Sequence, residues 1–122
     1  MKILVVEDNK INQIVTKKIL ESNNFKSTIL EDGYAAIELL DKENFDVILM
    51  DINMPIINGF DTTKLIRKKG ITTPIIALTA FDKQEITEQA LSSGMNDIII
   101  KPFEQAKLFQ VINSLVIKKN VD

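Results

Sequence analysis

Five short apolar segments alternate with five longer amphipathic segments, and this alternation restricts the possible folds more than any other feature of the chain. The apolar segments are Lys2–Val6, Phe25–Leu30, Asp46–Met50, Pro74–Leu78 and Asp97–Ile100. Short apolar runs of this kind, rich in β-branched residues, are typical of buried strands. Strands that alternate strictly with helices form a parallel sheet with helices on both faces. Phe25–Leu30 alternates more than the others, which favours a position at the sheet edge.

The amphipathic segments have the spacing of helices, and we expect their apolar residues to pack on the sheet. These residues are Ile11, Ile14, Val15 and Ile19 in the first segment; Tyr34, Ile37 and Leu40 in the second; Phe60, Leu65 and Ile66 in the third; Ile86, Ala90 and Leu91 in the fourth; and Leu108, Val111, Ile112 and Leu115 in the last. A length of 122 residues fits one domain, 1–122. A closed eight-unit barrel needs about twice that length. The predicted class is therefore an open, doubly wound α/β sheet.

Composition excludes several kinds of function. The net charge of −2 with 15 basic residues gives no electrostatic signature of nucleic acid or anionic membrane binding. Cysteine and histidine are both absent, so disulfides, thiolate metal sites and the commonest general base are excluded. The apolar run at the N-terminus is too short for a signal peptide or a membrane span. We therefore expect a cytoplasmic location, either free or as the cytosolic part of a larger protein.

Polar residues gather where the predicted strands end, which is where ligands bind in open α/β sheets. Glu7 and Asp8 follow the first strand, Asp51 the third, Thr79 the fourth and Lys101 the fifth. Taken singly, each could be a loop residue, and Asp8 or Asn9 could cap the first helix. If the first and third strands are neighbours, however, three carboxylates converge and raise each other's pKa. A hard cation such as Mg²⁺ relieves this repulsion.

Four motifs at these strand ends resemble those of response-regulator receiver domains, over essentially the whole chain. They are VVEDN at 5–9, LMDINMPIING at 49–59, PIIALTA at 74–80 and IIIKPF at 98–103. The resemblance implies a flavodoxin-like (βα)5 fold with strand order 2-1-3-4-5. It also implies a receiver of a two-component system or phosphorelay, which accepts a phosphoryl group on an aspartate with the help of Mg²⁺.

The resemblance assigns the acidic residues to two roles. Asp51 is implied as the phosphoacceptor. Asp8 and Asp51 are implied as carboxylate ligands of Mg²⁺, together with the backbone carbonyl of Asn53, and Glu7 is implied to act through a metal-bound water. Pro55 and Gly59 are read as residues that shape the loop behind the acceptor.

The basic and hydroxyl residues are implied to hold the phosphoryl group. Lys101 places its ammonium against Asp51 and then a phosphoryl oxygen, and the Lys101–Pro102 bond is expected to be cis. Thr79 donates its hydroxyl to another oxygen, near the Ala80 amide, and its movement switches the face formed by the fourth strand, the next helix and the fifth strand. Ile98 stands where many receivers have an aromatic residue. Phe81 is expected to obstruct hydrolytic water.

The absence of histidine means that the phosphoryl donor is another protein or domain, by resemblance a histidine kinase or a histidine phosphotransfer domain. EDNKINQ and GMNDIIIKPF resemble the receivers of hybrid histidine kinases, with a stand-alone regulator as the alternative. The domain is expected to be a monomer or a weak, phosphorylation-dependent dimer, with no independent substrate. An aspartate-nucleophile phosphatase of the haloacid dehalogenase type is a weaker reading, because Asn53 stands where that family has its general acid. A flavin-binding module and an inactive receiver fit less well.

Overall fold

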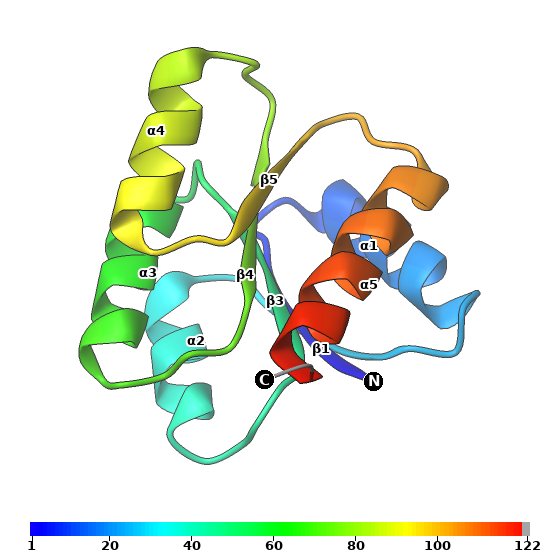
Figure 1. The fold of residues 1–122 in the computed structure, drawn as a ribbon, viewed down its shortest axis with the longest axis horizontal. Coiled ribbons are helices and arrows are strands. Elements are labelled where there is room, and N and C mark those ends of the chain that lie inside the picture. The colour runs from blue at the N-terminus through cyan, green and yellow to red at the C-terminus, as the bar shows by residue number, and fades with distance from the viewer. Residues whose placement is uncertain (121–122) are drawn as a thin grey trace.

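A computed structural model of the chain describes residues 1–120 and contains one parallel sheet of five strands in the order β2-β1-β3-β4-β5 (Figure 1). The strands are β1 (Lys2–Val6), β2 (Lys26–Leu30), β3 (Val47–Asp51), β4 (Ile75–Thr79) and β5 (Asp97–Ile100). The helices are α1 (Lys10–Glu21), α2 (Gly33–Leu40), α3 (Gly59–Lys68), α4 (Gln84–Ser93) and α5 (Gln105–Asn120). The predicted fold class and strand order are confirmed, as is the edge position of the second strand.

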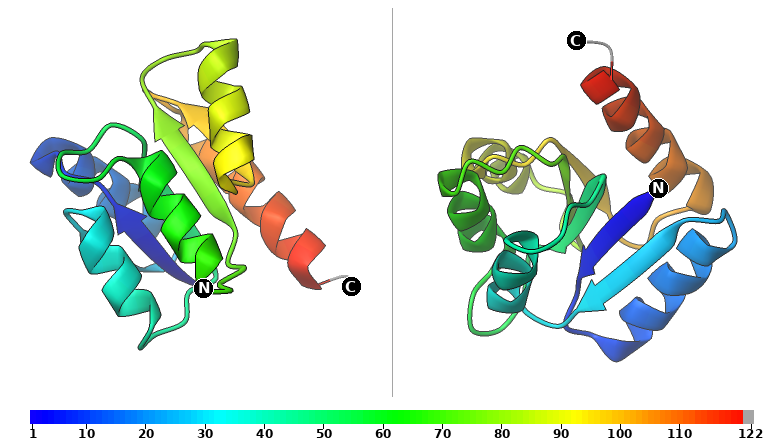
Figure 2. Two further views of the ribbon diagram at one scale, coloured as in Figure 1. Left: turned by 90° about the vertical axis from the view of Figure 1, so that its left-hand side faces the viewer. Right: turned by 90° about the horizontal axis from the view of Figure 1, so that it is seen from below.

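Helices cover both faces of the sheet. Helices α2, α3 and α4 lie on one face, while α1 and α5 lie on the other (Figures 1 and 2). Successive strand residues point to opposite faces, so each strand contributes to two cores. The core under α2, α3 and α4 includes Leu4, Val6, Ile48, Met50, Ile75 and Ala77. The core under α1 and α5 includes Ile3, Val5, Val47, Leu49, Ile76 and Leu78. Double coverage explains why these strands are almost continuously apolar.

Side-chain caps fix where three of the helices begin. Asn9, Asp32 and Asn58 each accept a hydrogen bond from the backbone N–H three residues later, at 3.0, 2.8 and 2.9 Å. Such caps satisfy helix N–H groups that have no partner within the helix. Of the two capping residues proposed from the sequence for α1, the structure uses Asn9. Among residues 1–120, no helix is long and apolar enough to cross a membrane.

Two strands end one residue later than the sequence predicts. Asp51 and Thr79 are the last residues of β3 and β4 and do not follow them. Parallel pairing continues to this point, since Asp51 is in register with Leu78 and Ile52 N–H donates to the Leu78 carbonyl at 3.1 Å. The polar side chains are therefore held by the sheet itself.

The predicted buried face of α1 is wrong except at Ile19, which packs at the edge of the core beneath α1 and α5. Ile11, Ile14 and Val15 are 72 %, 57 % and 50 % exposed, and the residues that bury are Thr16 and Leu20. Gln13, Thr16 and Leu20 share a helix face by their spacing. On this face the Gln13 amide donates to the Glu7 carbonyl at 2.6 Å, so a polar contact at the end of β1 accompanies the burial of Thr16 and Leu20.

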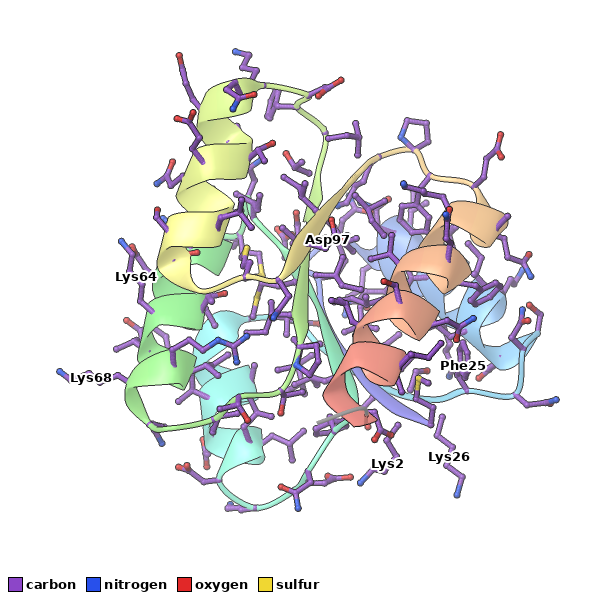
Figure 3. All side chains as sticks on the ribbon, viewed as in Figure 1. Lys2, Phe25, Lys26, Lys64, Lys68 and Asp97 are labelled. Atoms are coloured by element: carbon purple, nitrogen blue, oxygen red, sulfur yellow. The ribbon has the colours of Figure 1, made fainter. Side chains whose placement is uncertain are left out.

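The other helices agree better with the prediction. Leu108, Val111 and Ile112 of α5 are buried, and Leu115 packs at the edge of the same core. Tyr34 of α2, Leu65 of α3 and Leu91 of α4, which were expected to pack, are exposed. Lys64 and Lys68 extend from α3 away from the protein (Figure 3).

Candidate functional site

The carboxyl ends of the strands lie at one edge of the sheet, toward the top of Figure 1, and bring three acidic side chains together. Glu7 and Asp8 follow β1, and Asp51 ends the neighbouring β3. A carboxylate oxygen from each of the three lies within 4.8 Å of the others. Glu7 and Asp51 are buried, while Asp8 is partly exposed. The predicted convergence of carboxylates is therefore confirmed.

Lys101 reaches this acidic cluster from the end of β5. Its N–H donates to the Thr79 carbonyl at 2.7 Å, and the Lys101–Pro102 bond is cis, as expected. The Nζ atom lies 2.9 Å from Glu7 Oε1 and 3.4 Å from Asp51 Oδ1. One ammonium thus bridges two buried carboxylates.

The two buried carboxylates respond differently to this environment. Burial and the neighbouring carboxyl of Glu7 together raise the pKa of Asp51 to about 7, although the Lys101 ammonium acts to lower it. Burial also acts to raise the pKa of Glu7, but hydrogen bonds with Asp51 and Lys101 outweigh it and leave that pKa lowered. The expectation that the carboxyls raise each other's pKa is therefore wrong for Glu7. The hydrogen bond with Asp51 and the contact with the ammonium thus make Glu7 the carboxyl of the pair that ionises more readily.

Thr79 and the segment after it form the side of the site contributed by β4. The Thr79 side chain is buried, and its Oγ1 accepts a hydrogen bond from Phe81 N–H at 3.1 Å. Since the oxygen accepts this bond, the hydroxyl proton remains available to another acceptor. Ala80 is exposed next to Thr79. The Phe81 ring is half-exposed, with Lys83 Nζ 5.7 Å from its centroid.

The loop after β3 is closely packed against the end of that strand. Asn53 is exposed, and its N–H lies 3.4 Å from Asp51 Oδ1. Gly59 N–H donates to the Ile52 carbonyl at 2.9 Å, and a Cβ on Gly59 would lie 2.5 Å from the Asp51 carbonyl oxygen. Only glycine permits this approach, which supports the structural role predicted for it. Ile56 has a φ of 72°, a conformation that β-branched residues rarely adopt.

A hollow of about 400 Å³ adjoins the acidic cluster. Glu7 and Lys101 line it at the cluster, Val15 and Ile19 of α1 line one wall, and Phe103 lines the other. Val15 is also one of the exposed apolar residues of α1.

The sequence prediction missed Gln13, whose side chain holds the main chain at Glu7. The signal available in the sequence was its spacing. Gln13 lies on the same helix face as the buried residues Thr16 and Leu20, one turn closer to the start of the helix. A polar residue on a buried face is a sign that its side chain has a specific partner.

Comparisons with known proteins match residues 3–113 to the family model described as the response regulator receiver domain. The osmosensing histidine protein kinase SLN1 of Saccharomyces cerevisiae is 42 % identical over 119 residues, which cover 92 % of this chain and 10 % of SLN1. Two-component response regulator 24 of Arabidopsis thaliana is 33 % identical, over 92 % of this chain and 81 % of the relative. The chain thus spans about a tenth of the length of the histidine kinases it matches.

Solved structures share this fold closely. The receiver domain of sensor histidine kinase PA1611 from Pseudomonas aeruginosa PAO1 superposes with a TM-score of 0.87 and 38 % identity, covering 94 % of this chain and 96 % of that one. That structure has a magnesium ion coordinated in its active site cleft.

Proposed function

We infer that Asp51 is the phosphoacceptor of this chain, since the chain belongs to the family of response regulator receiver domains. The supporting observation is the position of its carboxylate, which is buried at the end of β3, paired with Lys101 and adjacent to two more carboxylates. Its Oδ atom attacks phosphorus and forms an aspartyl phosphate, while the bond from phosphorus to the donor's leaving atom breaks. Transfer of this kind depends on positioning and on neutralising the phosphoryl charge.

Mg²⁺ is the cofactor, and the residues present fit it. Three carboxylate oxygens lie within 4.8 Å of one another, and a hard cation prefers such a set. Asp8 and Asp51 would bind the ion directly, Asn53 through its backbone carbonyl, and Glu7 through an intervening water. The bound ion supplies positive charge to the phosphoryl oxygens. The related PA1611 receiver, which holds magnesium in its cleft, supports this assignment.

Lys101 and Thr79 complete the phosphoryl site. The Lys101 ammonium, 3.4 Å from Asp51 Oδ1, favours the ionised acceptor and then contacts a phosphoryl oxygen. The Thr79 hydroxyl proton, which its bond from Phe81 leaves available, is donated to a second oxygen near the Ala80 amide. This donation draws Thr79 toward Asp51 and alters the surface formed by β4, α4 and β5. Because its own residues position the phosphoryl group, the domain catalyses its own phosphorylation and dephosphorylation and has no independent substrate.

The phosphoryl donor is a phosphohistidine on a histidine kinase or a histidine phosphotransfer domain, since this chain has no histidine. The exposed apolar face of α1, formed by Ile11, Ile14 and Val15, lies beside the hollow that adjoins Glu7 and Lys101. Contiguous exposed apolar residues mark interaction surfaces. A donor that covers this face can reach the acceptor from the same side.

The chain is a single receiver domain, 1–122, that we assign to a hybrid histidine kinase, with a cytoplasmic location. The relatives that are histidine kinases, SLN1 among them, support this origin. Response regulator 24, of which the match covers 81 %, supports the alternative of a stand-alone regulator. In either setting we expect a monomer or a weak, phosphorylation-dependent dimer that does not contact nucleic acid or membrane directly. A phosphatase of the haloacid dehalogenase type is disfavoured by Asn53, which cannot act as its general acid.

Incubation with acetyl phosphate tests this function. With Mg²⁺ present, mass spectrometry should detect one added phosphoryl group on the wild-type protein and none on Asp51→Asn. Removal of Mg²⁺ by a chelator should abolish the addition. Asp61→Asn, at an exposed acidic position on α3, is the matched control and should label like the wild type. Labelling of Asp51→Asn at the wild-type level would refute the assignment.

A further inference from the structure

Gln13 connects α1 to the acidic segment that follows β1. Its Nε2 donates to the Glu7 carbonyl at 2.6 Å, in a partly buried position. The N–H of the same Glu7 donates to the Leu30 carbonyl of β2 at 3.0 Å. The main chain of Glu7 is therefore held on both sides, on one by the sheet and on the other by a helix side chain.

The contact acts at the peptide group that joins Glu7 to Asp8. The carbonyl that Gln13 holds belongs to this peptide group, so the contact restrains its rotation and with it the direction in which Asp8 leaves the backbone. Asp8 is partly exposed and has no described side-chain hydrogen bond that would orient it otherwise. Its carboxylate nevertheless lies within 4.8 Å of those of Glu7 and Asp51.

We propose that Gln13 is a positioning residue of the magnesium site, which holds the Glu7–Asp8 peptide so that Asp8 faces the other two carboxylates. The proposal rests on the proposed function, because it assumes that these carboxylates bind Mg²⁺. A carbonyl at the end of a strand needs a donor once the chain leaves the sheet. Gln13 supplies this donor from a fixed point, since α1 is capped by Asn9 and packed on the sheet through Thr16 and Leu20.

A role confined to helix stability would give a different outcome from a positioning role. If Gln13 positions the peptide, removing its hydrogen bond lets the Glu7–Asp8 peptide rotate and weakens Mg²⁺ binding. If Gln13 only anchors α1, removing the hydrogen bond lowers the unfolding free energy and leaves the affinity for Mg²⁺ unchanged. The dissociation constant for Mg²⁺ therefore separates the two roles.

The test replaces Gln13 with methionine, which has similar length and helix propensity but no donor. Mg²⁺ is titrated into the full chain and binding is followed through the backbone amide shifts of residues 7, 8 and 53, with urea unfolding of the metal-free protein measured in parallel. Loss of one hydrogen bond predicts Mg²⁺ binding about fivefold weaker than in the wild type. Gln13→Asn, whose amide is one methylene too short to reach, should weaken binding similarly and carries the test if Gln13→Met does not fold.

Gln110→Met is the matched control. Gln110 is exposed on α5, and the same substitution there should leave Mg²⁺ binding unchanged. Wild-type affinity in Gln13→Met, with or without a loss of stability, would overturn the proposal. A wild-type protein that binds no Mg²⁺ would instead overturn the proposed function, so the two failures are distinguishable.

Discussion

Replacing Arg67 by methionine is expected to lower the unfolding free energy by about 3 kcal/mol, although the residue lies far from the acidic site along the chain. Arg67 is the only arginine among 15 basic residues. Its guanidinium donates to four oxygens at 2.8–2.9 Å, and none of them belongs to a carboxylate. They are the carbonyls of Ile71, Thr73 and Gly94 and Oδ1 of Asn96. Arg67 therefore fastens the turn between α4 and β5 to the loop between α3 and β4.

The magnitude follows from these contacts. A hydrogen bond from a charged group contributes about 1.5 to 3 kcal/mol. The four oxygens that accept from Arg67 are partly exposed, however, so water can donate to some of them when the guanidinium is removed. If water replaces two of the four, the remaining two account for about 3 kcal/mol at the lower value. Burial lowers the pKa of Arg67, and the substitution removes that cost of burying charge, which is a further reason to use the lower value.

Urea unfolding measures the effect. With a slope of about 1.5 kcal/mol per molar urea, the midpoint should fall by about 2 M. Arg67→Lys keeps a charge but loses the planar fork, so it should recover only part of the stability. Lys68→Met is the matched control, because Lys68 extends away from the protein (Figure 3) and should lie within about 0.5 kcal/mol of the wild type. If Arg67→Met is no less stable than Lys68→Met, the four hydrogen bonds of Arg67 do not stabilise the fold as predicted.

Three further predictions concern the site and its loops. Ile56→Asn should raise the unfolding free energy by about 1 kcal/mol in urea unfolding, because Ile56 is 82 % exposed and asparagine tolerates its positive φ better; a loss of stability would contradict this. Without Mg²⁺, wild-type stability should fall relative to Asp51→Asn as the pH rises from about 4 to about 7, and no further above, because the folded protein keeps a proton on Asp51 that the unfolded chain has lost. If the unfolding free energies of the two proteins change in parallel with pH, this prediction is wrong. Phe81→Ala should shorten the lifetime of the phosphorylated protein by admitting hydrolytic water, and equal dephosphorylation rates would refute the obstruction.

The fold was predictable because its strands carry strong local signals. Lys2–Val6 and Asp97–Ile100 were predicted with the observed bounds, since each apolar run stops before a charged residue, Glu7 or Lys101, that also lies outside the strand. Asp51 and Thr79 were assigned to loops because polarity was taken as the end of a strand. In the structure, pairing with neighbouring strands continues one residue into the polar site.

Features that depend on contacts distant in sequence were not predictable from local patterns. The apolar pattern of α1 offers Ile11, Ile14 and Val15 as a packing face, but the structure buries the face of Thr16 and Leu20, where Gln13 also contacts Glu7. The contacts of Arg67 join segments up to 29 residues apart, and nothing in its own helix indicates them. The opposite pKa shifts of Glu7 and Asp51 likewise depend on burial, on the hydrogen bond between them and on the ammonium of Lys101, which joins them from β5.

The central claim is that Asp51 itself carries the phosphoryl group, and locating the modification tests it most directly. Reduction of the phosphorylated protein with borohydride converts an aspartyl phosphate to homoserine, which tandem mass spectrometry assigns to a position. We predict homoserine at residue 51 alone, and only after incubation with Mg²⁺ and a phosphoryl donor. Homoserine at residue 8, or a phosphoryl label that borohydride does not convert, would show that Asp51 is not the phosphoacceptor.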